Sequence, residues 1–152
     1  MSMVMRALQK RKNNESGFSL VELLVVVIII GILAAVSVPI YLNQRKAGWD
    51  SNAESDVKNA QIVVSTAMSA NNGKMPTQDK SGNAVTYPIY CHGGDQGSTA
   101  VIADQTVTCS AGVELEIDKD DDTNYKVIGH HTNGSHKYTY DSPNPTIIVD
   151  NL

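Results

Sequence analysis

The apolar residues of this 152-residue chain are concentrated in one stretch near its N-terminus. Across residues 18–42 the only charged side chain is that of Glu22, and residues 23–30 form an unbroken aliphatic run. A helix of about 25 residues spans roughly 37 Å, which exceeds the roughly 30 Å of hydrocarbon in a bilayer. The pattern therefore predicts a membrane-spanning helix over residues 18–42.

Beyond this stretch the periodicity becomes that of an amphipathic helix. Small apolar residues recur every three or four positions and would form one stripe along such a helix: Ala53, Val57, Ala60, Val64 and Ala67. The cluster Asn71-Asn72-Gly73 is expected to end the helix, with Gly73 as its C-terminal cap and Pro76 just past it. One helix is thus predicted from residue 18 to about residue 70, and its second half needs a sheet to cover the stripe.

The C-terminal part alternates between apolar and polar residues, as half-buried strands do. Four strands are predicted there: 113–117, 125–132, 135–140 and 146–149. The dipeptide Asn133-Gly134 is typical of a two-residue hairpin turn and would join the second of these strands to the third. Residues 73–112, rich in Gly, Ser, Asp and Pro, are predicted to be a long connecting region with one strand at 100–107.

Together these elements predict an α+β fold, in which a long N-terminal helix packs on a small antiparallel β-sheet. Residues 18–42 would lie in the membrane, and residues 43–152 would form one water-soluble head, since the chain is long enough for a single domain. Within the head we expect an amphipathic half-helix at 43–72, the connecting region at 73–112 and a β-meander at 113–152.

Charge is distributed as unevenly as hydrophobicity. Four basic residues precede the apolar stretch and are opposed only by Glu15: Arg6, Lys10, Arg11 and Lys12. The positive-inside rule therefore keeps this end in the cytoplasm and directs the head outward. Without residues 1–17, basic residues fall from 12 to 8 and acidic residues from 16 to 15, so the formal charge moves from −4 to −7. Because phosphate affinity rests on clustered Lys and Arg, we expect no direct nucleic-acid binding.

The chain has two cysteines, Cys91 and Cys109, and both lie in the predicted head. An even count in an exported domain favours one disulfide, which would stabilise the head by roughly 3 kcal/mol, mainly by restricting the unfolded chain. Two free thiols are the alternative. A zinc site is disfavoured because it needs more ligands at suitable spacing than two isolated cysteines provide.

Three interpretations compete for the N-terminal residues. A cleaved secretory signal has an apolar core of about 7–15 residues before a small-residue cleavage site. The core here is far longer, and Ala34, Ala35 and Ser37 match such a site only weakly. A plain single-span anchor explains the length and the basic flank but gives no role to Glu22. A carboxylate inside a spanning helix costs about 2.5–3.5 kcal/mol on insertion scales and usually marks a function.

The third interpretation rests on residues 17–22, which read Gly-Phe-Ser-Leu-Val-Glu behind the basic segment. This stretch closely resembles the processing motif of type IV prepilins, with Gly then Phe, a Glu five residues into the mature chain and an apolar run after it. In that family a membrane aspartyl peptidase cuts after the glycine and methylates the new N-terminal residue. The resemblance implies a leader of residues 1–17, cleavage after Gly17 and methylation of Phe18.

The resemblance also implies an assembly role for Glu22. In the family, this Glu neutralises the N-terminal amine of a neighbouring subunit, and a buried carboxylate that is costly alone becomes tolerable when paired. Gly31 and Pro39 lie where type IV pilins carry a helix-breaking Gly and Pro, in a stretch that can melt locally in the filament. Pro39 is expected to kink or loosen the helix, although membrane helices also tolerate both residues.

The implied function is that of a structural pilin, which builds a helical homo-oligomeric filament for adhesion, motility or DNA uptake. Its implied partners are the prepilin peptidase, the inner-membrane assembly machinery and, before assembly, the membrane. Its location would change from the inner membrane to the cell surface. A pseudopilin of a type II secretion or competence system is one alternative, and a single-span anchored binding protein is another. Many Gram-negative pilins place their disulfide around a C-terminal loop, a pattern from which Cys91 and Cys109 depart.

Two further clusters are candidate metal sites. Four oxygen-bearing side chains alternate like the first ligands of a calcium loop: Asp118, Asp120, Asp122 and Asn124. Thr123 and Gly129 stand where an EF-hand needs Gly and Glu, so a solvated acidic turn is the favoured interpretation. His131 would lie opposite His136 across the hairpin, where core-edge packing is favoured over zinc or copper because no third ligand is evident. We expect no cofactor and no enzymatic activity, since the sequence contains no nucleophile–base arrangement and no phosphate loop.

Overall fold

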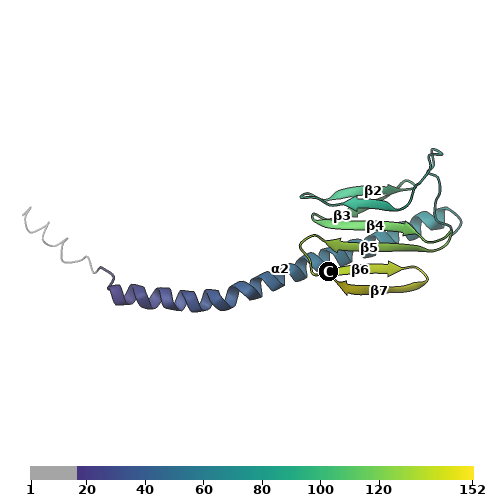
Figure 1. Cartoon of the computed structure of the whole chain (residues 1–152). Helices are drawn as coiled ribbons and strands as arrows, with labels where there is room; N and C mark the ends of the chain where they lie inside the picture. The colour runs from purple at the N-terminus through teal and green to yellow at the C-terminus, as the bar shows by residue number, and fades with distance from the viewer. Residues whose placement is uncertain (1–16) are drawn as a thin grey trace, which may run out of the picture. The chain divides into compact units, whose positions relative to one another are not determined.

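The computed structural model describes residues 17–152, which fall into two units with the boundary between Leu42 and Asn43. The predicted leader, up to residue 16, lies outside the described residues. One helix, α2 (Leu20–Ala70), begins in the first unit and ends in the second, and every described strand belongs to the second unit (Figure 1). The α+β fold predicted from the hydrophobic pattern is confirmed.

In the first unit, every residue of α2 is exposed. The most apolar 18-residue window of the helix has a mean hydropathy of 3.1, and none of this window is buried. By length and composition this stretch could cross a membrane. Its complete exposure distinguishes it from the core helix of a water-soluble domain, which would be covered by other elements.

In the second unit, the small apolar residues of α2 form the stripe that their spacing predicts. All of them are fully or almost fully buried: Ala53, Val57, Ala60, Val64 and Ala67. Their small size lets the helix approach the sheet closely. A Cβ added at Gly129 would come within 2.5 Å of Cγ2 of Val57, so this strand position requires a glycine.

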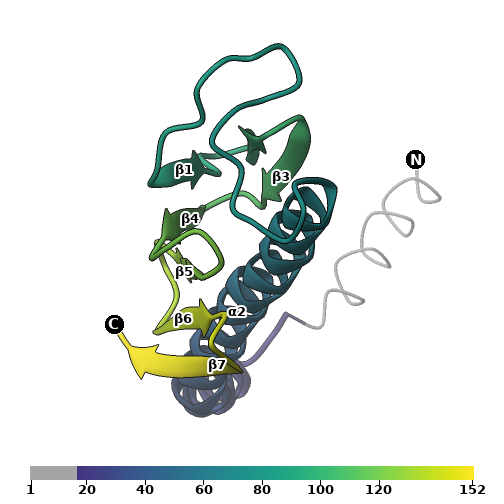
Figure 2. The same ribbon diagram turned by 90° about the vertical axis from the view of Figure 1, so that its right-hand side faces the viewer.

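The head part of α2 packs on one face of a five-stranded antiparallel sheet (Figure 2). The strands stand in the order β1 (Ile89–His92), β4 (Val113–Lys119), β5 (Tyr125–His131), β6 (His136–Asp141) and β7 (Asn144–Asn151). Alternate residues of the central strands are buried in the core, as the alternation predicts: Val113, Leu115, Ile117, Tyr125, Val127, Tyr138 and Tyr140. From β4 to β7 neighbours in the sheet are neighbours in sequence, so these four strands form a meander.

One predicted element is wrong, because residues 100–107 do not form a single strand. They belong to a hairpin of β2 (Ser98–Ile102) and β3 (Gln105–Cys109), which turns at Ala103 and Asp104. Both turn residues have positive φ, 45° and 69°, as a two-residue type I′ turn requires. The pair Ala-Asp is none of the dipeptides typical of a type I′ turn, so the strong hairpin signal is missing between the two strands. β1 lies in the same region and has only four residues, too few for a recognisable alternation.

The helix end differs in detail from the prediction. α2 ends at Ala70, and the first left-handed residue after it is Asn72, with φ of 57°. Gly73 follows with φ of 77°, and its N–H donates to the carbonyl of Met68 at 2.8 Å. This is the 6→1 hydrogen bond of a Schellman motif, which spans five residues back along the chain. In this motif Asn72 replaces the glycine that usually occupies the left-handed position.

The last two hairpins also deviate from the predicted boundaries. β5 and β6 pair in the predicted register, but the strands stop at His131 and His136, so the connection is longer than Asn133-Gly134 alone. β7 extends beyond the predicted 146–149 and includes Pro145. It can do so because β7 is an edge strand, where a proline is tolerated.

Candidate functional site

The bond predicted to be cleaved, between Gly17 and Phe18, lies outside α2. Residues 17–19 have no regular secondary structure. Ser19 caps the helix, because its carbonyl accepts a hydrogen bond from the N–H of Leu23 at 3.1 Å and its Oγ accepts one from the N–H of Val21 at 3.3 Å. The peptide bond that a peptidase would attack is therefore separated from the helix by one capping residue.

Ser19 is a residue that our sequence reasoning missed, although a signal for it exists. Ser19 and Glu22 are three residues apart at the start of an apolar run. This is the spacing of a capping box, in which a Ser and a Glu satisfy free N–H groups of the first helical turn. In the structure the Ser19 Oγ caps the helix through the N–H of Val21 rather than through that of Glu22.

Gly17 and Phe18 have open surroundings among the residues that the structure describes. There, a Cβ added at Gly17 would meet no heavy atom within 4 Å, and Phe18 exposes 83% of its surface. The fold of residues 17–152 therefore places no steric requirement on either residue. A requirement for glycine or phenylalanine at these positions would come from another protein that binds the segment.

The three predicted assembly residues all lie on α2. Glu22 is exposed in the first turn, where the partial positive charge of a helix N-terminus favours a carboxylate. A Cβ added at Gly31 would meet nothing within 4 Å in the described structure, so packing among residues 17–152 does not require this glycine. The helix continues through Pro39, although proline lacks the N–H that would bond to the carbonyl of Ala35. The predicted loosening at Pro39 stays a prediction for the filament.

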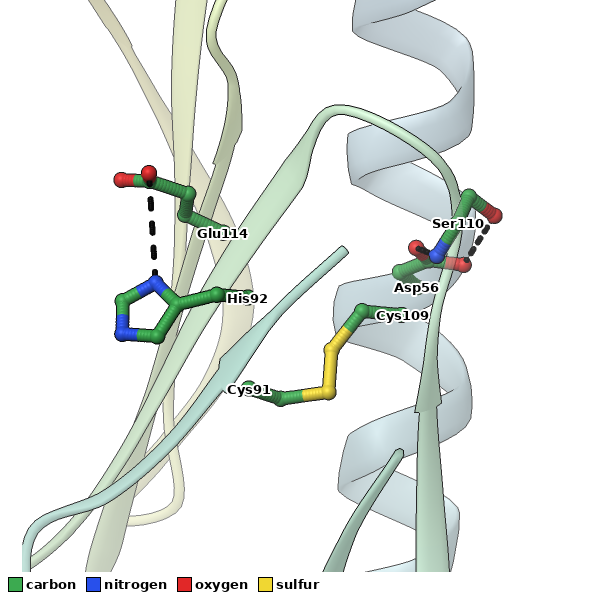
Figure 3. The surroundings of a disulfide bond; sticks show 6 residues. All are labelled: Asp56, Cys91, His92, Cys109, Ser110 and Glu114. Carbon is green, nitrogen blue, oxygen red and sulfur yellow. Dashed lines mark hydrogen bonds and ion pairs between the residues drawn. A yellow bond between two sulfur atoms is a disulfide. The ribbon is translucent and has the colours of Figure 1, made fainter. Parts of the chain in front are cut away.

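The predicted disulfide is formed in the head. Cys91 on β1 and Cys109 on β3 are both buried, and their Cα atoms are 6.2 Å apart (Figure 3). The bond ties the β2–β3 hairpin to the edge of the five-stranded sheet. Beside it, Asp56 of α2 accepts hydrogen bonds from the backbone N–H of Ser110 at 2.6 Å and from its Oγ at 3.0 Å. The hairpin is thus held both covalently to the sheet and by hydrogen bonds to the helix.

A second buried aspartate links α2 to the β5–β6 turn. Oδ1 of Asp50 accepts hydrogen bonds from the N–H groups of Ser135 at 2.7 Å and of His136 at 3.1 Å. Its Oδ2 lies 2.7 Å from Nδ1 of His136. Burial raises the pKa of Asp50, but the hydrogen bonds from His136 and Ser135 outweigh it, so the pKa stays below its ordinary value.

The two histidines of the β5–β6 hairpin have separate structural partners. His131 is buried and stacks on Trp49 with ring centroids 5.3 Å apart, and its Nδ1 accepts a hydrogen bond from the N–H of Asn133. The Arg45 guanidinium lies 5.0 Å from the centroid of the Trp49 ring. Since His136 bonds to the aspartate described above, both rings take part in packing at the edge of the core, which was the favoured interpretation.

The acidic turn between β4 and β5 is organised around Asp121 rather than around the alternating candidates. Asp121 accepts hydrogen bonds from the backbone and side chains of Thr123 and Asn124, and these bonds lower its pKa to about 2. The three candidate carboxylates have other partners: Asp118 the N–H of Lys119, Asp120 the Nζ of Lys126, and Asp122 the Nζ of Lys119. Among residues 17–152, no three metal-ligating side chains converge on one point.

On the face of the five-stranded sheet that points away from α2, strand pairing aligns three residues that the sequence analysis did not connect. Glu114 of β4 stands between His92 of β1 and His130 of β5. Its carboxylate oxygens lie 3.9 Å from Nδ1 of His92 and 3.6 Å from Nε2 of His130. Protonated histidines would pair with this carboxylate, but all three side chains are substantially exposed, so the contribution to stability is small.

Comparison with known proteins bears on the N-terminal segment. A family model described as the prokaryotic N-terminal methylation motif matches residues 12–38. No curated protein and no solved structure matches the chain. The chain thus carries the prepilin-type motif shared by pilins and pseudopilins, and with its apolar helix it fits a membrane-anchored precursor. Gly17, Phe18, Glu22 and Gly31 lie within the matched segment, and Pro39 is the residue just after it.

Proposed function

We propose that this chain is a structural subunit of a type IV pilus filament. It is made as a prepilin, cleaved after Gly17, N-methylated at Phe18 and assembled through the apolar half of α2. The observation that carries the proposal is the match to the methylation motif over residues 12–38, together with the apolar stretch of α2, whose most apolar 18-residue window has no buried residue. A peptidase substrate and a surface for association thus lie together in one segment.

The exposure of the apolar half of α2 supports association as its role. Its large apolar side chains each expose about half of their surface or more, from 46% at Val26 to 82% at Leu20. Soluble monomers rarely expose contiguous apolar patches larger than a few hundred Å². Burying one such side chain contributes about 1.5–3 kcal/mol. The membrane covers this surface before assembly, and neighbouring subunits cover it in the filament.

Glu22 gives this association its register. Cleavage after Gly17 creates a free amine on Phe18, at the start of the segment that contains Glu22. In apolar surroundings an unpaired carboxylate or ammonium group is strongly disfavoured, whereas a hydrogen-bonded pair is tolerated. A pair between Glu22 of one subunit and the Phe18 amine of its neighbour therefore favours one docked arrangement over others.

The head is suited to a location outside the cytoplasm. Its Cys91–Cys109 disulfide belongs to an oxidising compartment. The proposed partners are the prepilin peptidase, the inner-membrane assembly machinery and further copies of this chain, and the filament serves adhesion, motility or DNA uptake. We propose no catalytic activity for the chain itself and no direct binding of nucleic acid by the single subunit.

Filaments sheared from the cell surface test this proposal. We expect the sheared fraction to contain this chain at native expression, and deletion of its gene to remove the chain and reduce the filaments. A pseudopilus subunit would instead stay in the cell envelope in short assemblies. A simple anchored protein would stay in the membrane fraction with residues 1–17 attached. Either of these two results would contradict the proposal.

A further inference from the structure

We infer that Ser19 is the residue that positions the scissile bond, because its cap starts α2 immediately after itself and leaves Gly17–Phe18 unwound for the peptidase. This inference rests on the proposed function, since it concerns the same processing step. It assigns to Ser19 a role as a positioning residue: the hydroxyl acts on the conformation of the neighbouring peptide bond and not on the reacting atoms.

The hydrogen bonds at the helix start carry the inference. The Oγ of Ser19 accepts the N–H of Val21, and the Ser19 carbonyl accepts the N–H of Leu23, so the first helical turn closes on Ser19. Gly17 and Phe18 precede this turn and have no regular structure. Nothing in residues 19–152 packs on them, since in the described part of the chain Phe18 is exposed and a Cβ at Gly17 would meet nothing within 4 Å. The cap is therefore the local feature that separates the scissile bond from the helix.

Removal of the cap would move the helix start toward the leader. The first N–H groups of any helix lack intrahelical partners, and near hydrocarbon they cannot all be satisfied by water. Without the Ser19 hydroxyl, one way to satisfy the N–H of Val21 is to extend the helix so that it bonds to the carbonyl of Gly17. The scissile peptide would then lie inside a helical turn.

The chemistry of cleavage makes this extension costly. The peptidase adds water to the carbonyl carbon of Gly17, the bond to the Phe18 nitrogen breaks, and the products are a carboxyl group on Gly17 and an amine on Phe18. The attacked carbonyl must be accessible, and a carbonyl inside a helical turn is hydrogen-bonded and shielded. When opening is faster than cleavage, the cleavage rate follows the population of the unwound form.

The test compares four variants of the full-length precursor in membranes that contain the prepilin peptidase. Ser19→Thr and Ser19→Asn keep a side-chain oxygen that caps a helix, whereas Ser19→Val and Ser19→Ala lack it, and Val has the shape of Thr. We expect the Thr and Asn variants to be cleaved at nearly the wild-type rate. We expect the Val and Ala variants to be cleaved about fivefold more slowly, in line with the typical effect of losing one cap.

A second readout separates capping from recognition of the serine by the peptidase. Hydrogen exchange at the amides of residues 18–21 in detergent, without peptidase, should show that the helix extends toward Gly17 in the Val and Ala variants only. Equal cleavage rates for all four variants would overturn the inference. So would an Asn variant that is as slow as the Val variant, because that pattern indicates recognition of the hydroxyl. If the wild-type precursor itself is not cleaved, the proposed function fails, which is a distinguishable outcome.

Discussion

Two aspartates, Asp50 and Asp56, lie buried beside the apolar stripe of the head helix, and each accepts hydrogen bonds from a turn of the β-structure. Asp56 holds the turn after β3 through Ser110, and Asp50 holds the β5–β6 turn through Ser135 and His136. Backbone N–H groups that would otherwise be buried without partners are satisfied in this way. These contacts fix the position of the helix on the sheet at two points, whereas apolar packing alone is non-directional and would let the helix shift.

Asp50→Asn is predicted to destabilise the head by about 1–3 kcal/mol near neutral pH, because the charged acceptor of three hydrogen bonds is lost. The pKa of Asp50 is lowered in the folded state, so its contribution is fully present above the unfolded pKa of 3.8 and is lost as pH falls through the folded pKa. Thermal unfolding at several pH values should therefore show a constant difference from wild type above about pH 5, and a smaller one below about pH 4.

Glu54→Gln is the matched control, since Glu54 lies on the same helix and its carboxylate pairs with Lys58 at an exposed position. We expect this variant to change stability by less than about 1 kcal/mol at any pH. A difference between Asp50→Asn and wild type that grows as the pH falls below about 4 would contradict the assigned direction of the Asp50 pKa.

Glu22→Ala is predicted to block assembly and spare processing. The variant subunit should insert in the membrane at least as well as wild type, because a charge is removed from an apolar segment. It leaves the neighbour's Phe18 amine unpaired, which typically costs about 3–5 kcal/mol and depresses assembly by about a hundredfold or more. Immunoblots should show a processed subunit in the membrane fraction and little in sheared filaments.

The control for this prediction is Glu54→Ala, which also removes one carboxylate from α2 but does so in the exposed part of the head helix. We expect it to assemble normally. If the Glu22 variant builds filaments at wild-type abundance, Glu22 has no role in assembly and the register argument is wrong.

At the residue scale, the sequence indicated the residues that break a pattern. Glu22 is conspicuous because it interrupts an apolar run, and two cysteines have only one way to pair with each other. Asp50 and Asp56 interrupt nothing, since a polar residue on an amphipathic helix is expected to be solvated. Their partners lie 86 and 54 residues further along the chain, and local patterns carry no information about such pairs.

Among the elements, the β2–β3 hairpin stands apart from the main sheet and is joined to it by the disulfide. Loss of the disulfide in Cys91→Ser/Cys109→Ser is predicted to destabilise the head by about 3 kcal/mol, because the unfolded chain regains the freedom of the open loop. Differential scanning calorimetry should show a midpoint lower by roughly 10 °C for a head of this size.

Reductant provides the control for this prediction. Wild-type protein with reductant should unfold near the midpoint of the double variant, and the double variant itself should not respond to reductant. Alkylation of both thiols in native protein without reductant would show that the disulfide is not formed, which would contradict the structure.

Elements with a clear alternation or stripe were predictable, and elements that depend on unusual turns were not. The meander from β4 to β7 follows from alternation and from turn residues such as Asn133-Gly134. The β2–β3 hairpin turns at Ala103 and Asp104, and the left-handed conformation of Ala103 is held by strand pairing against its intrinsic preference. β1 owes its position to pairing with β4 and to the bond at Cys91, neither of which a four-residue segment reveals.

At the scale of the whole molecule, the two units differ in how their apolar surface is covered. The head has a continuous core between helix and sheet, closed by one disulfide and by hydrogen bonds from two aspartates. The apolar half of α2 is left uncovered by the rest of residues 17–152. This contrast is the physical basis of the proposed function, because the uncovered surface must be buried by lipid or by other subunits.

The central claim is that the assembled protein is a processed subunit, and intact-mass spectrometry of sheared surface filaments tests it most directly. Removal of residues 1–17 from the 152-residue chain leaves 135 residues. We expect the mass of these 135 residues with one disulfide and one added methyl group, and fragmentation should place the methyl group on the amine of Phe18. A filament protein that still contains residues 1–17, or one that begins at another residue, would contradict the account.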